Sequence, residues 1–317
     1  MSAQKSVLRS YSTCLTTHLK TISGGIWLPL FVSTGKLPRL TTLRIGAGTI
    51  VSNETAALIN ARCKLFTTVV LSRSDQTTFT SLLALVTKCD NITTISLYNT
   101  CYINSPSVVV AIAMNCPHLL SLNLGGGVNV DDAALVEVAT RCSHLTSLNL
   151  SDCCDLTEPG VCAMIARLSN LTAINVTGID CSSGTPTMLA LAQCPKLQCV
   201  KGFDSDELDA ASVIALALGC PFLQMLKIGF DCQVDDTCLI ALARNCGSLV
   251  YVDFSGCVSV SDHGVQELLR CCPNLQCMDL MSPSCSRGIS VAYSNICKAN
   301  EKVRISFYRE VNLSYDL

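Results

Sequence analysis

The sequence is poor in charge and lacks any long hydrophobic run. Charged residues make up 15% of its 317 residues, against about 25% in a typical soluble domain. The net charge of −2 excludes the strongly basic surface of a general nucleic-acid binder. The best apolar stretch, residues 25–32, is far shorter than the roughly 18 residues that cross a bilayer, so we expect no membrane span. Disorder is excluded as the main state, because 49% of the residues are hydrophobic.

Motifs for catalysis or metal binding are also missing. Despite 22 cysteines, the sequence contains no Cys-x-x-Cys pair of the kind that zinc modules use. Residues 33–36 end like a phosphate-binding loop, but the leading glycine is replaced by Leu30. His118 and His144 lie 26 residues apart and are interpreted as exposed residues rather than ligands. We therefore predict a non-enzyme with no cofactor, no metal and no small-molecule substrate.

An internal repeat organises the chain. The pattern Leu-x-x-Leu-x-Leu, with related apolar residues, recurs in steps of 26 residues except one of 27. Many repeats continue with Asp or Ser and then an apolar stripe at helical spacing, which predicts a capped helix after each strand; Asp131, Asp235 and Ser261 are the clearest caps. The first positions of the repeats are Leu40, Phe66, Ile92, Leu119, Leu145, Leu171, Leu197, Leu223, Leu249 and Leu275, with a degraded copy at Asn300.

A column of cysteines accompanies the repeat, three residues before each first position. Leucine replaces cysteine at two places in this column, and leucine can neither bind a metal nor form a disulfide. We therefore interpret the cysteines as compact buried filler with free thiols. No secretory signal is visible, so we expect a reducing compartment, cytoplasmic or cytoskeleton-associated. The column consists of Leu37, Cys63, Cys89, Cys116, Cys142, Leu168, Cys194, Cys220, Cys246, Cys272 and Cys297.

The repeat resembles the cysteine-containing class of leucine-rich repeats, found in F-box/LRR proteins and in proteins of the antagonist-of-mitotic-exit-network type. The resemblance covers residues 37–308. It implies an α/β solenoid (horseshoe) with a concave parallel sheet of about 10–11 strands, convex helices and a role in protein recognition. The matching residues are Cys142-x-x-Leu145-x-x-Leu148-x-Leu150-x-x-Cys153 and Cys246-x-x-Leu249-x-x-Val252-x-Phe254-x-x-Cys257.

Three parts are expected along the chain. Residues 1–36 form a basic N-terminal cap, residues 37–300 about ten repeats, and residues 301–317 a C-terminal cap. An F-box should precede the repeats of a ubiquitin-ligase receptor, and none is found in residues 1–36. The first acidic residue of the chain is Glu54, and the N-terminal segment is rich in Ser and Thr. This composition is also typical of a mitochondrial transit peptide, which here would end near residue 11.

The strand pattern predicts where a partner binds. Alternation sends the leucines into the core and the intervening residues to the concave face. In the second half of the solenoid these residues combine aromatic and Met anchors with paired charges, a composition typical of interaction hot spots. Alternatively, neighbouring Lys and Asp residues simply neutralise one another across the sheet. The predicted partner-binding residues are Lys201, Phe203, Met225, Lys227, Phe230, Tyr251, Asp253, Asp279 and Met281.

One repeat departs from the pattern. Gly202 stands where a core leucine belongs, which predicts a gap or bulge marking either a bend, a docking notch or decay of the repeat.

The predicted function is a non-catalytic scaffold or adaptor in a larger assembly, which binds a protein partner on the concave face. Low charge and high hydrophobicity suggest that neighbours cover much of its surface. Two alternatives stay open at this point: a substrate-recognition subunit of a ubiquitin ligase, and a mitochondrial assembly or RNA-associated factor located in the matrix.

Overall fold

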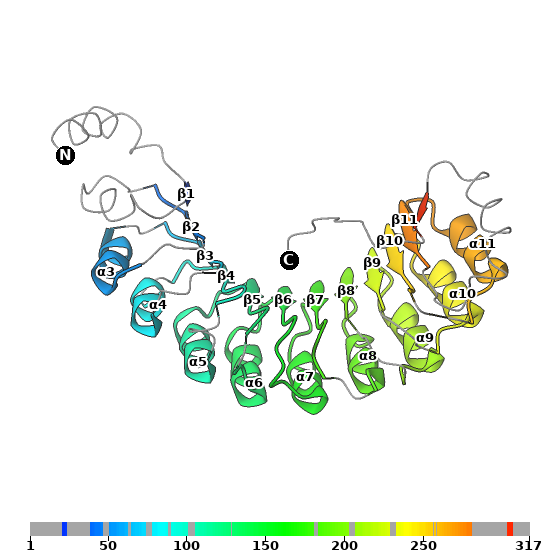
Figure 1. Cartoon of the computed structure of the whole chain (residues 1–317), viewed down its shortest axis with the longest axis horizontal. Helices are drawn as coiled ribbons and strands as arrows, with labels where there is room; N and C mark the ends of the chain where they lie inside the picture. The colour runs from blue at the N-terminus through cyan, green and yellow to red at the C-terminus, as the bar shows by residue number, and fades with distance from the viewer. Residues whose placement is uncertain are drawn as a thin grey trace. The chain divides into compact units, whose positions relative to one another are not determined.

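The chain divides into two compact units, residues 1–145 (unit 1) and 146–317 (unit 2), which are described separately. Both consist of strands alternating with helices along the chain (Figure 1). The computed structural model describes residues 21–23, 39–46, 51–62, 65–73, 78–87, 90–100, 105–127, 129–180, 183–202, 207–228, 233–255, 257, 259–280 and 303–306.

Unit 1 contains a parallel sheet whose strands follow the order of the chain. Its strands are β1 (Thr21–Ser23), β2 (Thr42–Ile45), β3 (Thr68–Leu71), β4 (Thr94–Ser96) and β5 (Ser121–Asn123). The helices between them lie on one side of the strands (Figure 1). They are α3 (Asn53–Arg62), α4 (Phe79–Val86), α5 (Pro106–Asn115) and α6 (Asp132–Arg141).

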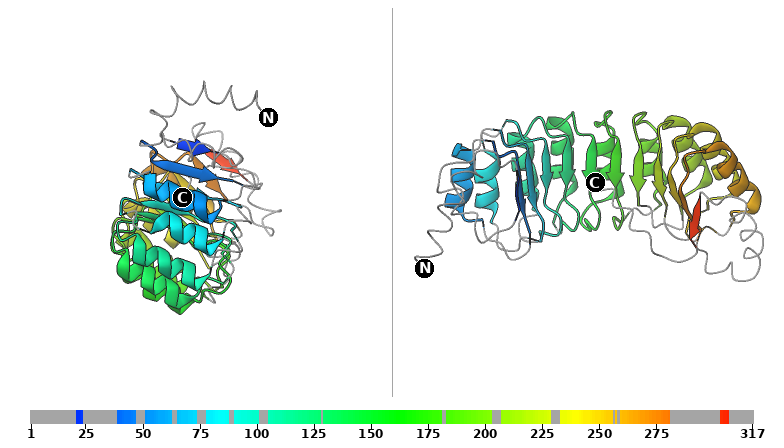
Figure 2. Two further views of the ribbon diagram at one scale, coloured as in Figure 1. Left: turned by 90° about the vertical axis from the view of Figure 1, so that its left-hand side faces the viewer. Right: turned by 90° about the horizontal axis from the view of Figure 1, so that it is seen from above.

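Unit 2 repeats this arrangement. Its strands are β6 (Ser147–Asn149), β7 (Ala173–Asn175), β8 (Cys199–Lys201), β9 (Met225–Lys227), β10 (Tyr251–Asp253), β11 (Cys277–Asp279) and β12 (Arg304–Ser306), paired in parallel and in order. Its helices are α7 (Glu158–Ile165), α8 (Thr185–Leu191), α9 (Ala210–Gly219), α10 (Asp236–Asn245) and α11 (Asp262–Cys271). Figure 2 shows α8–α11 side by side along one face of these strands.

The core lies between the strands and the helices, where the repeat pattern places it. In β6, β7 and β8 the middle residue points into this core and lies in register with its counterpart on the next strand. Leu148, Ile174 and Val200 form such a row and are fully buried. Because the row continues from strand to strand, each repeat buries the apolar face of its neighbours.

The predicted helix caps are confirmed. Oδ1 of Asp131 accepts the backbone N–H of Ala134 at 2.8 Å. Asp235 and Ser261 cap α10 and α11 in the same way. These side chains satisfy backbone donors that have no partner within the first helical turn.

The described residues contain twelve strands, close to the 10–11 that were predicted. The degraded copy near Asn300 forms β12, as its spacing indicates. In addition, β1 lies within the segment predicted to be an N-terminal cap, and Ile22 pairs with Leu43 of β2. The pattern around Ile22 ends in Gly24 instead of leucine, which is why the repeat pattern does not predict this strand.

Gly202 does not leave the gap that the sequence predicts. Its φ angle is +117°, and a Cβ atom there would lie 2.6 Å from the backbone nitrogen of Thr177. The backbone at Val176 and Thr177 of the preceding repeat therefore occupies the space, and the glycine permits this close approach. The predicted gap is wrong at this position, because backbone atoms replace the missing side chain.

None of the helices within the described ranges has both the length and the apolar character that crossing a bilayer requires.

Candidate functional site

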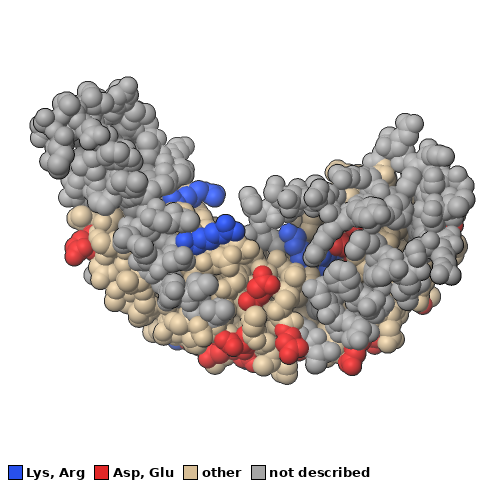
Figure 3. All heavy atoms as spheres, viewed as in Figure 1, with Lys and Arg blue, Asp and Glu red and all other residues tan. Residues whose placement is uncertain are grey.

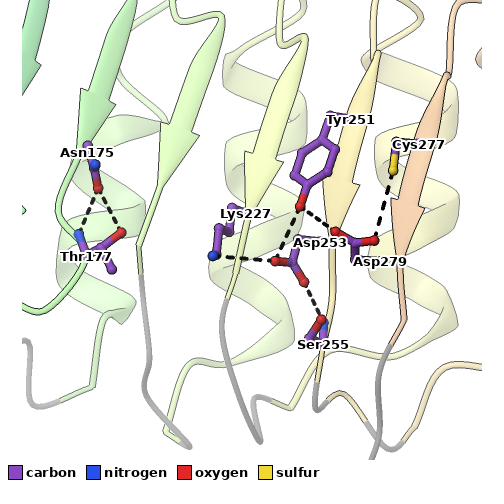
Figure 4. Close-up of polar contacts among 8 residues, drawn as sticks. All are labelled: Asn175, Thr177, Lys227, Tyr251, Asp253, Ser255, Cys277 and Asp279. Carbon is purple, nitrogen blue, oxygen red and sulfur yellow. Dashed lines mark hydrogen bonds and ion pairs between the residues drawn. The ribbon is translucent and has the colours of Figure 1, made fainter. Parts of the chain in front are cut away.

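Two rows of side chains cross β8–β11 on the face opposite the helices, here called the open face. Figure 4 shows members of these rows on β9–β11. Each row takes one residue from each strand, in direct register. The charged row is Lys201, Lys227, Asp253 and Asp279, and the apolar row is Cys199, Met225, Tyr251 and Cys277. The register places side chains of one row about 4.8 Å apart from strand to strand.

An ion pair joins β9 to β10 within the charged row. Nζ of Lys227 lies 3.7 Å from Oδ2 of Asp253, and the two side chains are 36% and 9% exposed. Oδ1 of Asp253 accepts the backbone N–H of Ser255 at 3.0 Å, which fixes the carboxylate (Figure 4). For this pair, the charge neutralisation considered from the sequence is therefore observed.

Tyr251 connects the two carboxylates of the charged row. Its hydroxyl donates to Oδ2 of Asp279 at 2.6 Å and approaches Oδ2 of Asp253 at 3.5 Å. Burial raises the pKa of Tyr251 far above its usual value, and the hydrogen bond to Asp279 and the negative charges of both carboxylates raise it further. The hydroxyl therefore remains a donor at physiological pH, and it offsets part of the repulsion between the carboxylates.

The apolar row is closely packed. Met225, Tyr251 and Cys277 form one buried cluster, against which the half-buried Cys199 packs. Sγ of Cys199 lies 3.5 Å from Sδ of Met225. Burial raises the pKa of the Cys199 thiol, although the charge of Lys201 opposes this shift.

Six of the nine predicted partner-binding residues lie together on β8–β11. Met225, Tyr251 and Asp253 are buried, whereas Lys201 and Lys227 keep substantial exposure. The side chain of Lys201 forms no ion pair or hydrogen bond with any residue that the structure describes. Three predicted residues lie outside the described residues: Phe203, Phe230 and Met281.

The sequence reasoning missed one role of the open-face asparagines. Oδ1 of Asn175 accepts the backbone N–H of Thr177 at 3.1 Å and its hydroxyl at 2.8 Å. Asn123 and Asn149 accept the N–H two residues ahead in the same way. These side chains terminate their strands as Asx turns. The signal that could have found them is Asn at the end of a strand, followed two residues later by Gly, Ser or Thr.

The cysteine column is a second group of chemically active side chains, buried on the helix side of the sheet. Five thiols of the column donate to the backbone carbonyl of the column residue one repeat earlier: those of Cys142, Cys194, Cys220, Cys246 and Cys272. Sγ of Cys142 lies 3.4 Å from the oxygen of Cys116, and Sγ of Cys246 lies 3.5 Å from that of Cys220. The same bond reaches the carbonyl of Leu168 from Cys194 at 3.9 Å. Leucine therefore accepts in this column although it cannot donate. Cys63, Cys89 and Cys297 lie outside the described residues.

Burial keeps these thiols protonated. It raises the pKa of Cys142 and Cys272 to about 11, and that of Cys220 and Cys246 to about 12. Metal ligation needs the thiolate, so burial disfavours zinc here. Within the described ranges no three His, Cys, Asp or Glu side chains are grouped to hold a metal ion.

The repeat and the fold together define the class: the chain has a leucine-rich-repeat fold. The family model described as "Leucine Rich repeat" matches residues 141–164. The structure is similar to that of Rad7 from yeast, solved in complex with Elc1, with a TM-score of 0.59 and 16% identity over 86% of this chain and 77% of Rad7. It is also similar to internalin C2 from Listeria monocytogenes, with a TM-score of 0.51 and 20% identity over 75% of this chain and 93% of the internalin. No curated protein sequence matches the chain.

Proposed function

We propose that the chain is a non-catalytic protein-interaction subunit that binds a protein partner on the open face of β8–β11. The observation that carries this proposal is the charged row beside a packed apolar row. The N–H of Ser255 and the hydroxyl of Tyr251 hold Asp253, and Asp253 in turn pairs with Lys227. Such a preorganised polar edge next to apolar groups suits protein recognition, because little conformational entropy is lost on binding.

The surface composition supports membership of a larger assembly. Helices α8 and α9 contain no charged residue. Leu218 of α9 and Phe222 just after this helix are 65% and 58% exposed. Figure 3 shows basic and acidic side chains on only small parts of the visible described surface. Leucine-rich-repeat domains typically mediate protein–protein interactions, and the thiols of the cysteine column favour a reducing compartment.

Quantitative affinity purification tests this proposal. The wild-type chain is compared with the double variant Lys201→Glu and Lys227→Glu, which reverses the exposed charge of the open face. Lys196→Glu is the matched control, since Lys196 lies in the turn before β8 and contacts Asn170 at 2.7 Å. We expect the double variant to lose specific partners that the control retains. Equal retention by all three chains, or the absence of any specific partner, would contradict the proposal.

A second candidate function is substrate recognition in a ubiquitin ligase. It is motivated by the resemblance of the repeats to F-box/LRR proteins and by the similarity to Rad7, which was crystallised with Elc1. The test is direct mixing of the purified chain with Elc1 and with ligase linker subunits in size-exclusion chromatography. Co-elution at micromolar concentration would favour this function over a scaffold outside the ligase system.

A further inference from the structure

We propose that the partner presents an acidic segment to the open face, with a carboxylate placed between Lys201 and Lys227. This inference rests on the proposed function and specifies the chemistry of the partner. Both lysines belong to the charged row, on the neighbouring strands β8 and β9. The site is built entirely within unit 2.

The two lysines are an unfavourable pair in the free chain. Lys201 and Lys227 lie directly opposite each other in the register, and like charges at such positions repel. Asp253 pairs with Lys227 at 3.7 Å. Among the described residues, no carboxylate forms an ion pair with Lys201. A carboxylate from a partner would remove this repulsion and would gain two charge-assisted hydrogen bonds.

The donors around Lys201 are oriented in advance. On one side, Asn175 lies in register with Lys201, and its Oδ1 is occupied by the N–H and hydroxyl of Thr177. The NH2 group of this amide is not used in these two bonds and remains as a donor. On the other side, Lys227 is held by Asp253, whose second oxygen accepts from Ser255. Strands β7, β8 and β9 thus offer three neighbouring donors for one anion.

The same row argues for a protein partner and against nucleic acid. Asp253 and Asp279 follow the lysines on the next two strands, about 5 and 10 Å beyond Lys227. A sugar-phosphate backbone carries a charge at every nucleotide and would meet these carboxylates. An acidic protein segment can place its charge over the lysines and an uncharged residue farther along. The half-buried Cys199 provides an apolar contact beside Lys201.

A displayed library of random peptides of about twelve residues tests the inference without knowledge of the natural partner. An extended peptide of that length spans about 40 Å, which is enough to cross the row. The library is selected on the full wild-type chain, and enriched peptides are synthesised and titrated by fluorescence anisotropy. We expect the enriched peptides to share an Asp or Glu. Their affinity should fall at least about tenfold on Lys201→Glu and stay within about twofold on Lys196→Glu. It should also weaken as salt is raised, because the contact is electrostatic.

A charge swap makes the test specific. Changing the shared acidic residue of the peptide to lysine should abolish binding to the wild-type chain and restore it on Lys201→Glu. The inference is overturned when no acidic residue is shared among enriched peptides, when no peptide is enriched, or when Lys201→Glu binds like the wild type. Tighter binding of a single-stranded RNA oligonucleotide at the same lysines would also overturn it. The double lysine variant could lose partners in the affinity purification while the selected peptides share no acidic residue. That outcome would refute only the acidic segment and would leave the proposed function intact.

Discussion

The thiol of Cys246 donates a hydrogen bond to the backbone carbonyl oxygen of Cys220, which belongs to the preceding repeat and lies 3.5 Å away. That carbonyl also accepts the N–H of Leu223 at 3.2 Å. The carbonyl oxygen of Cys220 thus accepts two hydrogen bonds, one from the turn of its own repeat and one from the thiol of the next repeat. The cysteine does more than fill space, because it satisfies a second lone pair in a buried position.

Replacing Cys246 by alanine should therefore destabilise the chain. We expect the free energy of unfolding to fall by about 1–2 kcal/mol, since both buried volume and a hydrogen bond are lost. Urea unfolding followed by circular dichroism measures the change. Cys154→Ala is the matched control, because Cys154 is exposed, and its unfolding midpoint should not move. Equal stability of the two variants would contradict the structural role of the column.

The raised thiol pKa values predict how stability depends on pH. Folding raises the pKa of Cys220 and Cys246 from the reference value of 9.0 to about 12. The contribution of these thiols to stability is complete below pH 9 and is lost as pH rises toward 12, because only the unfolded chain releases protons in that range. For each of these thiols, the free energy of unfolding should fall by at most about 1.4 kcal/mol per pH unit in this range.

Urea unfolding between pH 8 and 11 measures this loss, and the pH values are chosen to bracket the reference thiol pKa of 9.0. The double variant Cys220→Ala and Cys246→Ala should show a shallower slope than the wild-type chain. A slope that is the same in both chains would rule out the column thiols as its source.

Tyr251→Phe should destabilise unit 2, because it removes the hydroxyl between two carboxylates. Asp279 loses a donor at 2.6 Å, and its charge and that of Asp253 are left to repel. We expect a loss of about 1.5–3 kcal/mol in the free energy of unfolding, the usual range for hydrogen bonds to charged groups. Tyr98→Phe provides the comparison, since the structure gives Tyr98 no hydroxyl hydrogen bond to the residues that it describes. A similar small effect at both tyrosines would argue against the bridging role.

Gly202→Ala should be strongly destabilising. The new Cβ would lie 2.6 Å from the backbone nitrogen of Thr177, and φ is +117°. Backbone atoms cannot move aside as a flexible side chain could, so we expect a loss of at least about 2 kcal/mol in thermal or urea unfolding. Gly247→Ala is the control, because nothing lies within 4 Å of a Cβ there. It should change stability by less than about 0.5 kcal/mol.

The periodic features of this protein were predictable from its sequence. The buried row that contains Leu148 and Ile174 follows from a spacing that recurs ten times, and the cap at Asp131 follows from one residue and its position. Both depend on local geometry, which the repeat reproduces each time. The pairing of Lys227 with Asp253 was one of two outcomes that the pattern allowed.

Features that depend on one particular neighbour were not predictable. The bridge from Tyr251 to Asp279 needs a side-chain rotamer that only the surrounding packing selects. The approach of the Thr177 backbone to Gly202 depends on how two repeats meet, and the sequence showed only a missing leucine. In the same way, a compact residue was expected at Cys246, but its hydrogen bond requires the carbonyl of another repeat.

Each bond of the cysteine column spans a single boundary between repeats, and this has a consequence for how the protein opens. Damage at one cysteine weakens one boundary directly and leaves the others intact. Amide hydrogen exchange after Cys246→Ala should therefore accelerate first in α9 and α10, on the two sides of that boundary, while α7 keeps its protection. We therefore expect the solenoid to unfold locally, in groups of repeats. The least stable boundary between repeats then determines where a protease first cleaves the chain.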